Sequence, residues 1–197
     1  MRIIAGIARS IPLFTPKDDS VRPAMDSTRA AIFSSLGDAV VGAECLDLFA
    51  GTGSIGLEAL SRGASTCVFV EKNKMSLGLL KKNMEKTKLE GMVYPTDAVA
   101  SLERFSEKGA KFDLVFADPP FTKRTDLKNN LLSNPEQRHF ARELLENKFL
   151  PKILKPGGFF VLDSYDHDRF EVPAPWNIFR EKVYGQVRVR FLILQSA

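Results

Sequence analysis

The stretch Cys45-Leu-Asp-Leu-Phe-Ala-Gly-Thr-Gly-Ser-Ile-Gly56 decides the fold. A short apolar run precedes Gly51, Gly53 and Gly56, which have the spacing G-x-G-x-x-G, and an apolar helical pattern begins at Ile55. Glycines at such a turn permit positive φ, let the backbone approach a ligand and let a helix pack closely on a strand. The stretch therefore predicts a strand, a tight turn and a helix N-terminus that favours an anionic or polar ligand group.

Glu71 strengthens this interpretation, because a glycine pattern alone is a weak signal. It ends the next apolar run, Thr66–Val70, twenty positions after Gly51. A carboxylate at that place can accept hydrogen bonds from both hydroxyls of a ribose. The alternative is a glycine turn followed by a helix-capping acid, and the agreement between motif and context favours a nucleoside cofactor.

The composition is that of one globular domain. The 197 residues suffice for a full core, and 44% hydrophobic with 26% charged residues is ordinary for a water-soluble protein. The apolar runs are too short to span a membrane and Met1–Gly6 has no signal-peptide core, so we expect a cytoplasmic protein. Cys45 and Cys67 are expected to be small core residues. The net charge of +4 permits a nucleic-acid partner without requiring one.

Strand and helix patterns alternate five times along the chain and are followed by a hairpin. This order predicts an α/β fold with a mixed seven-stranded sheet, mainly parallel, with helices on both faces. The closing hairpin, 177–184 and 187–194 around Gly185, is expected to form an antiparallel pair at the sheet edge. Ligands of such sheets bind at the carboxyl ends of the strands. Four acidic residues are predicted to gather at that edge: Asp47, Glu71, Asp97 and Asp118.

Two units are predicted: an N-terminal β-hairpin extension over residues 1–20 and the main domain over 21–197. Residues 2–9 and 11–16 are expected to form the two short strands, with Pro12 limiting the second to an edge. Arginines on such a ribbon could contact a phosphate backbone, and a solvated hairpin packed on the domain is the alternative. The basic residues here are Arg2, Arg9, Lys17 and Arg22.

Three further segments carry expectations. Asp26 or Ser27 is a candidate N-cap for the helix that follows. Residues 122–134 are polar without a period and are predicted to form a mobile loop. The acidic residues Asp163, Asp166 and Asp168 with His167 could suggest a metal site, but no helical His spacing or Cys partner supports one. We predict a solvated loop there and no metal, and Trp176 is expected to anchor its loop.

Asp118-Pro119-Pro120-Phe121 follows the fourth predicted strand and indicates the reaction. The prolines hold the backbone extended and have no N–H, so the turn presents only carbonyls. The Asp118 carboxylate and the Pro119 carbonyl can together accept both hydrogen bonds of an NH₂ group. Phe121 can stack on the flat ring that carries the NH₂, which is worth about 1–3 kcal/mol.

These motifs together resemble the S-adenosylmethionine-dependent class I methyltransferases that modify exocyclic or amide nitrogens. Met1-Arg-Ile-Ile-Ala-Gly6 and Arg22-Pro-x-x-Asp26-x-x-Arg29 are similar to the narrower RsmD-type family, which methylates N2 of a guanine in 16S ribosomal RNA. The resemblance covers nearly the whole chain. It departs from the family pattern at Ser10-Ile11, Ala24 and Ala30.

The resemblance implies a Rossmann-like fold, S-adenosylmethionine as cofactor, no metal, and a monomer acting on ribosomal RNA or a small-subunit particle. The implied cofactor contacts are Asp47, Phe49, Gly51, Thr52, Gly53, Glu71, Lys72, Asp97, Ala98 and Asp118. The implied catalytic residues are Asp118, Pro119, Pro120 and Phe121. The implied RNA contacts are Arg2, Arg9, Arg22, Asp26 and Phe121.

Rival interpretations keep the cofactor and change the acceptor. A DNA adenine-N6 methyltransferase would usually need a target-recognition segment, for which this chain has little length, and protein amide methyltransferases tend to have Asn where Asp118 stands. A binding or assembly factor that kept the fold and lost the reaction is a non-enzymatic alternative. A dinucleotide-dependent oxidoreductase has no use for two prolines at the fourth strand end.

Overall fold

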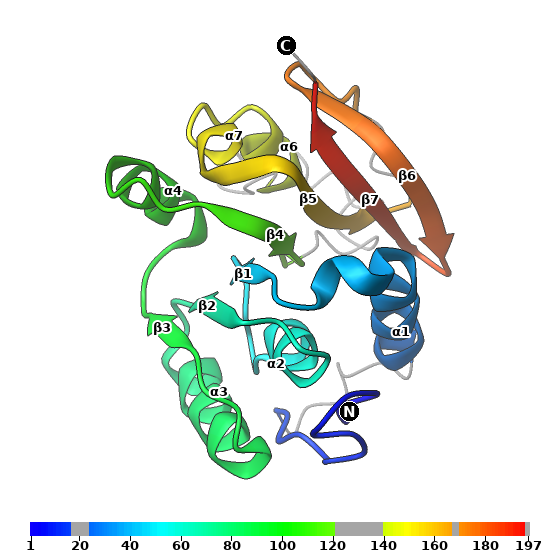
Figure 1. Cartoon of the computed structure of the whole chain (residues 1–197), viewed down its shortest axis with the longest axis vertical. Helices are drawn as coiled ribbons and strands as arrows, with labels where there is room; N and C mark the ends of the chain where they lie inside the picture. The colour runs from blue at the N-terminus through cyan, green and yellow to red at the C-terminus, as the bar shows by residue number, and fades with distance from the viewer. Residues whose placement is uncertain (17–23, 121–139, 167–169, 196–197) are drawn as a thin grey trace, which may run out of the picture.

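The seven apolar strand patterns of the sequence pair into one twisted sheet, seen in a computed structural model of the chain (Figure 1). The structure describes residues 1–16, 24–120, 140–166 and 170–195. The strand order is β3-β2-β1-β4-β5-β7-β6. The strands are β1 (Glu44–Asp47), β2 (Thr66–Val70), β3 (Met92–Tyr94), β4 (Phe112–Ala117), β5 (Leu154–Tyr165), β6 (Trp176–Tyr184) and β7 (Val187–Leu194).

The first five strands run parallel, and β7 runs antiparallel to both β5 and β6. The predicted mixed sheet and its closing hairpin are therefore confirmed. Parallel strands buried on both faces need continuous apolar sequence, and residues 67–70 of β2 and 114–117 of β4 have it.

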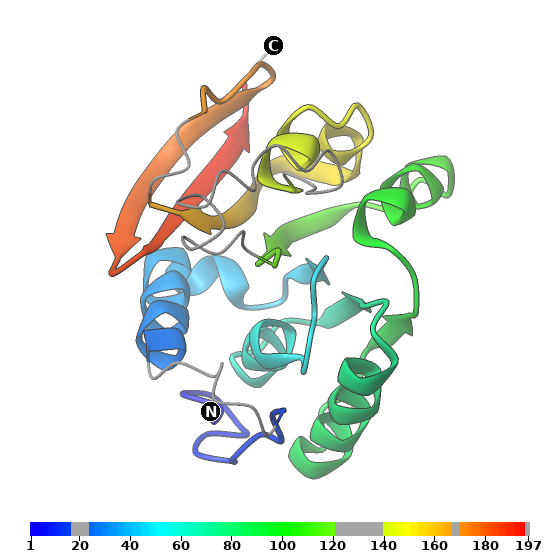
Figure 2. The ribbon, with the colours of Figure 1, turned by 180° about the vertical axis from the view of Figure 1, so that it is seen from behind.

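Helices cover both faces of the sheet, as Figures 1 and 2 show from opposite sides. The first four helices, up to Thr87, and residues 1–13 pack on one face through a core that includes Phe33, Leu57 and Leu80. The last three helices pack on the other face through Leu102, Leu145 and others. The helices are α1 (Ala24–Leu36), η1 (Gly37–Val40), α2 (Ser54–Ser61), α3 (Lys74–Thr87), α4 (Ala98–Glu107), α6 (Phe140–Leu145) and α7 (Leu150–Ile153).

The N-terminal segment does not form the predicted pair of strands. A single bridge joins Arg2 and Pro12, and turns fill the segment between them. Backbone hydrogen bonds such as that from the Ile3 N–H to the Ile11 carbonyl (3.0 Å) join the two halves of the segment, and the N–H of Ile7 donates to the carbonyl of Ser61 in α2 (2.8 Å). Ile3, Ala8 and Leu13 join the main core. The division of the chain at residue 20 remains a prediction.

The structure confirms the predictions for the two cysteines and Trp176 and contradicts an N-cap prediction. Cys45 and Cys67 are buried free thiols, as predicted. Trp176 is buried, packs on Phe160 and donates from Nε1 to the Leu145 carbonyl (3.1 Å), which confirms it as an anchor. The N-cap prediction at Asp26 or Ser27 is wrong, because α1 begins at Ala24. None of the described helices has the length and apolar character that crossing a membrane requires.

Candidate active site

Four acidic residues occupy the carboxyl edge of the parallel strands. Asp47 ends β1, Asp118 directly follows β4, Glu71 directly follows β2, and Asp97 comes shortly after β3. The negative charges of Asp118 and Glu71 both raise the pKa of Asp47. At least three of these carboxylates are therefore close enough to interact, at the edge where open α/β sheets bind ligands.

Asp47 is a buried acid with an unused acceptor. Its Oδ2 atom accepts from the Gly56 N–H (3.0 Å), and its Oδ1 atom is buried without a hydrogen-bond partner. Burial raises the pKa of Asp47 to about 7, and the charges of Asp118 and Glu71 add to the effect. Buried acceptors are normally paired, so this oxygen fits a donor on a ligand or a bridging water.

The glycine turn leaves room beside its backbone. Gly51 and Gly53 have positive φ (54° and 86°). A Cβ atom on Gly51 would have no neighbour closer than the Phe49 carbonyl oxygen at 4.0 Å, so this part of the turn is open. A Cβ atom on Gly56 would lie 2.3 Å from the Phe69 ring, so Gly56 is needed where α2 packs on β2. Thr52 accepts from Asn83 Nδ2 through its carbonyl (2.9 Å).

Glu71 is held in place by backbone donors. The Gly51 N–H donates to its Oε2 atom (2.8 Å), and the Asn73 N–H donates to its Oε1 atom (2.7 Å). Each carboxylate oxygen has a second lone pair, so both can still accept from a hydroxyl. The contact with Gly51 ties the acid to the glycine turn, which supports the pairing of these two motifs predicted from their spacing.

Asp97 is the N-cap of α4. Its Oδ1 atom accepts from the N–H groups of Val99 (3.1 Å) and Ala100 (3.3 Å), and its Oδ2 atom accepts from Lys72 Nζ (3.0 Å). Ala98 is buried as the first residue of this helix. Lys72 therefore bridges the end of β2 to the start of α4, and both residues remain at the rim.

Phe49 and Phe140 form an aromatic contact beside these charges. Their ring centroids are 5.2 Å apart in an edge-on arrangement, and Lys72 Nζ lies 5.9 Å from the centre of the Phe140 ring. Such a surface suits the flat ring of a nucleoside base. The sequence carries no sign of this contact, because no local pattern connects the start of α6 with Phe49.

The acidic Pro-Pro turn stands at the centre of this edge. Asp118 is half-buried, Pro119 is buried and Pro120 is exposed. Burial raises the pKa of Asp118 to about 6. The prolines have no N–H that could donate to the Asp118 carboxylate or the Pro119 carbonyl. The turn therefore keeps these two acceptors, as its sequence predicts. Phe121 lies outside the described residues.

Asp163 requires a correction. The sequence predicts a solvated loop at this position, but β5 continues to Tyr165 and the Asp163 side chain is only 5% exposed. Its apolar run ends at Leu162, and pairing with β7 keeps the next three residues in the sheet. Burial and the charge of Asp118 raise the pKa of Asp163 well above its usual value. Among the described residues, no three His, Cys, Asp or Glu side chains are placed to hold a metal ion together.

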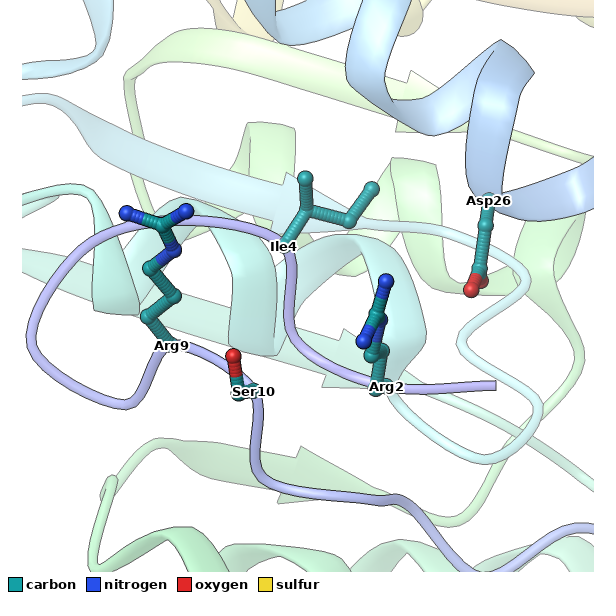
Figure 3. A pocket seen from close by; sticks show the side chains of 5 residues that line it. All are labelled: Arg2, Ile4, Arg9, Ser10 and Asp26. Atoms are coloured by element: carbon teal, nitrogen blue, oxygen red, sulfur yellow. The ribbon is translucent and has the colours of Figure 1, made fainter.

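A second feature lies on the N-terminal segment. Arg2, Ile4, Arg9, Ser10 and Asp26 line a cavity of about 260 Å³ (Figure 3). Figure 3 shows the side chains of Arg2 and Arg9 on the same side of the segment, with Asp26 beside Arg2. Three of the five expected RNA contacts thus line one hollow. Of the other two, Arg22 and Phe121, the structure describes neither.

A buried ionic group that the sequence did not reveal holds this segment. Glu58 is fully buried and accepts from the N–H groups of Ile4 (2.7 Å) and Ala5 (3.0 Å) and from Arg62 Nε (2.7 Å). Arg29, also buried, lies 3.6 Å from the Glu58 carboxylate and 3.0 Å from Asp26. Asp26 is thus part of an ion-pair chain as well as of the cavity wall.

The family model "Conserved hypothetical protein 95" matches residues 1–193 of the chain. The chain belongs to this family. The match covers the N-terminal segment, the glycine turn and the Asp118 turn alike, and it confirms the resemblance to the RsmD-type family.

Curated and solved relatives of this family agree in length. The chain is 34% identical over 191 residues to "Ribosomal RNA small subunit methyltransferase D" of Escherichia coli (strain K12), covering 96% of this chain and 88% of the relative. It is 32% identical over 192 residues to the protein of the same name from Haemophilus influenzae, covering 96% and 92%. A solved structure, "Putative methyltransferase yhhF from Escherichia coli", is 32% identical, covers 100% and 99%, and superposes with a TM-score of 0.77.

This RsmD-type chain has two separate features, a carboxyl-edge site and an arginine-lined cavity. The carboxyl-edge acids and the glycine turn lie on the sheet, and the arginine-lined cavity lies on the segment that packs against α2 and α3. Asn83 links them: Nδ2 donates to the carbonyls of Phe14 (3.0 Å) and Thr52 (2.9 Å).

Proposed function

We propose that this protein transfers a methyl group from S-adenosylmethionine to the exocyclic N2 of a guanine in small-subunit ribosomal RNA. The observation that supports this most directly is the position of Asp118. It stands at the carboxyl end of β4, next to Asp47 and the glycine turn on β1, in a chain whose family relatives are named ribosomal RNA methyltransferases.

The cofactor fits the residues of this edge. Asp47 has a buried, unpaired oxygen for the amino group or a bridging water, Gly51 leaves space beside its backbone, and Glu71 has free lone pairs for the ribose hydroxyls. Phe49 and Phe140 offer an aromatic surface for adenine, with Lys72, Asp97 and Ala98 beside it. Thr52 and Gly53 complete the turn.

The protein's chemical work is positioning and charge. When bound, S-adenosylmethionine supplies a methyl group on a positively charged sulfur, which is already a good leaving group. Asp118 and the Pro119 carbonyl accept from the two N–H bonds of N2, which turns the nitrogen lone pair toward the methyl carbon. A C–N bond forms as the C–S bond breaks, and the N2 proton passes to Asp118 or to water. Holding three atoms in line can supply about 7–11 kcal/mol.

Substrate RNA is proposed to reach the N-terminal segment as well as the Asp118 turn. Arg2 and Arg9 are exposed and converge on one cavity, where they could pair with phosphate oxygens. Arg22 and Phe121 are further proposed contacts. A monomer working on the small-subunit particle in the cytoplasm would suit this role, and a base paired in the RNA would have to be exposed first.

The test is transfer of a radioactive methyl group from S-adenosylmethionine to unmethylated small ribosomal subunits, followed by digestion to nucleosides. Label in N2-methylguanosine is expected, with a loss of at least a hundredfold in Asp118→Ala, in line with lost positioning. Glu90→Gln changes an exposed acid before the amino end of β3, opposite the carboxyl edge of the sheet, so it serves as the control and should keep full activity. Label in adenosine, DNA or protein would assign a different acceptor, and tight cofactor binding without any label would indicate a binding factor.

A further inference from the structure

Asp163 is a buried carboxyl group that the proposed reaction does not use. It lies in β5 with a 5% exposed side chain, and among the described residues no hydrogen bond or ion pair to it is seen. An unpaired buried acid is energetically unfavourable, and a neighbouring carboxylate makes it worse. Asp163 therefore lowers the free energy of unfolding, and the groups that it faces can explain its presence.

Sheet register places Asp163 beside Asp118. Strands β4 and β5 are parallel, and Ala117 pairs with Leu162, so the next residue on each strand is one of the two acids. Neighbouring strands are about 4.8 Å apart, which brings their side chains within reach of one small ligand. The electrostatic influence of Asp118 on Asp163 shows the same proximity.

Both acids point to the same face of the sheet. Phe116 and Val161, two residues earlier on each strand, belong to the core beneath α1, α2 and α3. Because side chains alternate along a strand, Asp118 and Asp163 continue that face. Asp47 does so too, two residues after Cys45 in the same core. The strand order β1-β4-β5 puts Asp118 between Asp163 and the cofactor turn.

We infer that Asp163 recognises the N1–H and O6 groups of the guanine whose N2 rests on Asp118, and so selects guanine over other bases. The inference rests on the proposed function. Guanine presents an acceptor and two donors in a row, O6, N1–H and N2–H₂, on its Watson–Crick edge. Adenine and cytosine have an acceptor where guanine has N1–H, so they leave one of the two acids unmatched.

The protonation of the pair matches this pattern. Two adjacent carboxyls that are largely removed from water share a proton, and the buried Asp163 holds it more strongly than the half-buried Asp118. A neutral Asp163 donates to O6 from its O–H and accepts from N1–H with its other oxygen, while an ionised Asp118 accepts from N2–H. This order also turns N2 toward the glycine turn and N1 away from it, as methyl transfer to N2 requires.

The experiment uses a substrate analogue. Once nuclease fragments of the labelled RNA have located the methylated guanine, it is replaced, in a synthetic small-subunit rRNA fragment, by 2-aminopurine, which keeps the N2 amine but has neither N1–H nor O6. The wild-type protein should prefer guanine by about tenfold or more in kcat/KM, because sites built to hydrogen-bond a group reject analogues that lack it. Asp163→Leu should reduce this preference to about threefold or less.

A conservative variant separates recognition from folding. Asp163→Asn replaces the neutral acid with an amide that has one donor and one acceptor in the same places, so it should keep the guanine preference. Ser164→Ala, one residue on and on the opposite face of β5, removes hydrogen bonds to Arg190 and Arg188 and should change stability without changing the ratio.

The outcomes are distinct. Loss of the ratio in Asp163→Leu with retention in Asp163→Asn supports the inference, whatever the absolute rates of the variants. An unchanged ratio in Asp163→Leu, or a wild-type protein that treats both bases alike, overturns it. If wild type methylates no guanine in the parent RNA, the proposed function itself fails.

Discussion

Asp47 shows how one residue can oppose stability while serving a site. It is buried with one unpaired oxygen, and its pKa is raised from 3.8 to about 7. The folded protein therefore binds a proton more tightly here than the unfolded chain does. By linkage, this residue makes the free energy of unfolding fall as pH rises from about 4 to about 7.

Asp47→Asn removes that titration and keeps an acceptor for the Gly56 N–H. Three pKa units correspond to about 4 kcal/mol, and a buried unpaired NH₂ costs about 1–3 kcal/mol, so we expect a net gain near 2 kcal/mol above pH 7. Urea unfolding at pH 5 and pH 8 would measure it, with the gain smaller at pH 5. Calorimetry should show weaker S-adenosylmethionine binding, about tenfold. A variant that binds as tightly as wild type would remove Asp47 from the cofactor site.

Asp118 gives the reaction a pH dependence. Burial raises its pKa to about 6. Only the ionised carboxylate can accept a hydrogen bond from the amine with either oxygen and then take up the proton that the amine releases. The rate constant kcat/KM should therefore rise about tenfold per pH unit below pH 6 and level off above it. Asp118→Asn should abolish the slope along with most of the activity, whereas Glu90→Gln should leave the profile unchanged. A flat wild-type profile from pH 5 to 8 would contradict this role.

At the scale of elements, the N-terminal segment depends on one acid of α2. Glu58 accepts from the backbone of Ile4 and Ala5 and from Arg62, and Arg29 lies beside it. A Cβ atom on Gly6 would lie 1.7 Å from the Ser61 carbonyl oxygen, so the segment lies flat against the helix. The segment thus belongs to the core through contacts that its own sequence does not encode.

Glu58→Gln should release this segment. Removing one partner of a buried ion pair costs about 3–5 kcal/mol, because Arg29 is left uncompensated. Urea unfolding would measure the loss, and amide exchange at Ile4 and Ala5 should accelerate more than exchange in β4. The exposed Glu90→Gln is the matched control. Unchanged protection at Ile4 and Ala5 would show that packing alone holds the segment.

The same scale shows what sequence reasoning could predict. Glu71 and Asp118 could be predicted because each follows an apolar strand, and Asp47 because it lies at the end of one, since parallel strands end at one edge. Asp163 was missed because Asp-Ser-Tyr breaks the apolar run, while pairing with β7 carries β5 past it. Glu58 was missed because its partners, Ile4 and Ala5, are 54 and 53 positions away and no local pattern connects them.

At the scale of the whole molecule, the alternation of strands and helices predicted the architecture, because connection rules leave few topologies for it. The segment over residues 2–16 did not follow from such rules. Some of its backbone donors go to α2 and α3 and others pair within the segment, and one bridge is all that forms of the expected ladder. Its surface carries Arg2 and Arg9, and the chain as a whole has a net charge of +4.

RNA binding should therefore weaken as salt increases. Each phosphate contact on a single strand contributes about 0.7 to the slope of log affinity against log salt, so Arg2→Ala with Arg9→Ala should reduce the slope by about 1.4. Filter binding of a small-subunit rRNA fragment at salt concentrations from about 50 to about 200 mM would measure this slope. Lys81→Ala with Lys82→Ala removes the same charge from the exposed side of α3 and should leave the slope nearly unchanged.

The contacts of Glu58 and Asn83 also bear on how the protein is made. Ile4 and Phe14 leave the ribosome well before their partners, which are 54 and 69 positions further along the chain. The arginine-bearing segment therefore cannot complete its docking until synthesis has passed α3. Protease treatment of ribosome-bound chains stopped at increasing lengths should show it protected only after Asn83 has emerged. A protein proposed to modify ribosomes would thus complete its RNA-contacting surface only late in its own synthesis on a ribosome.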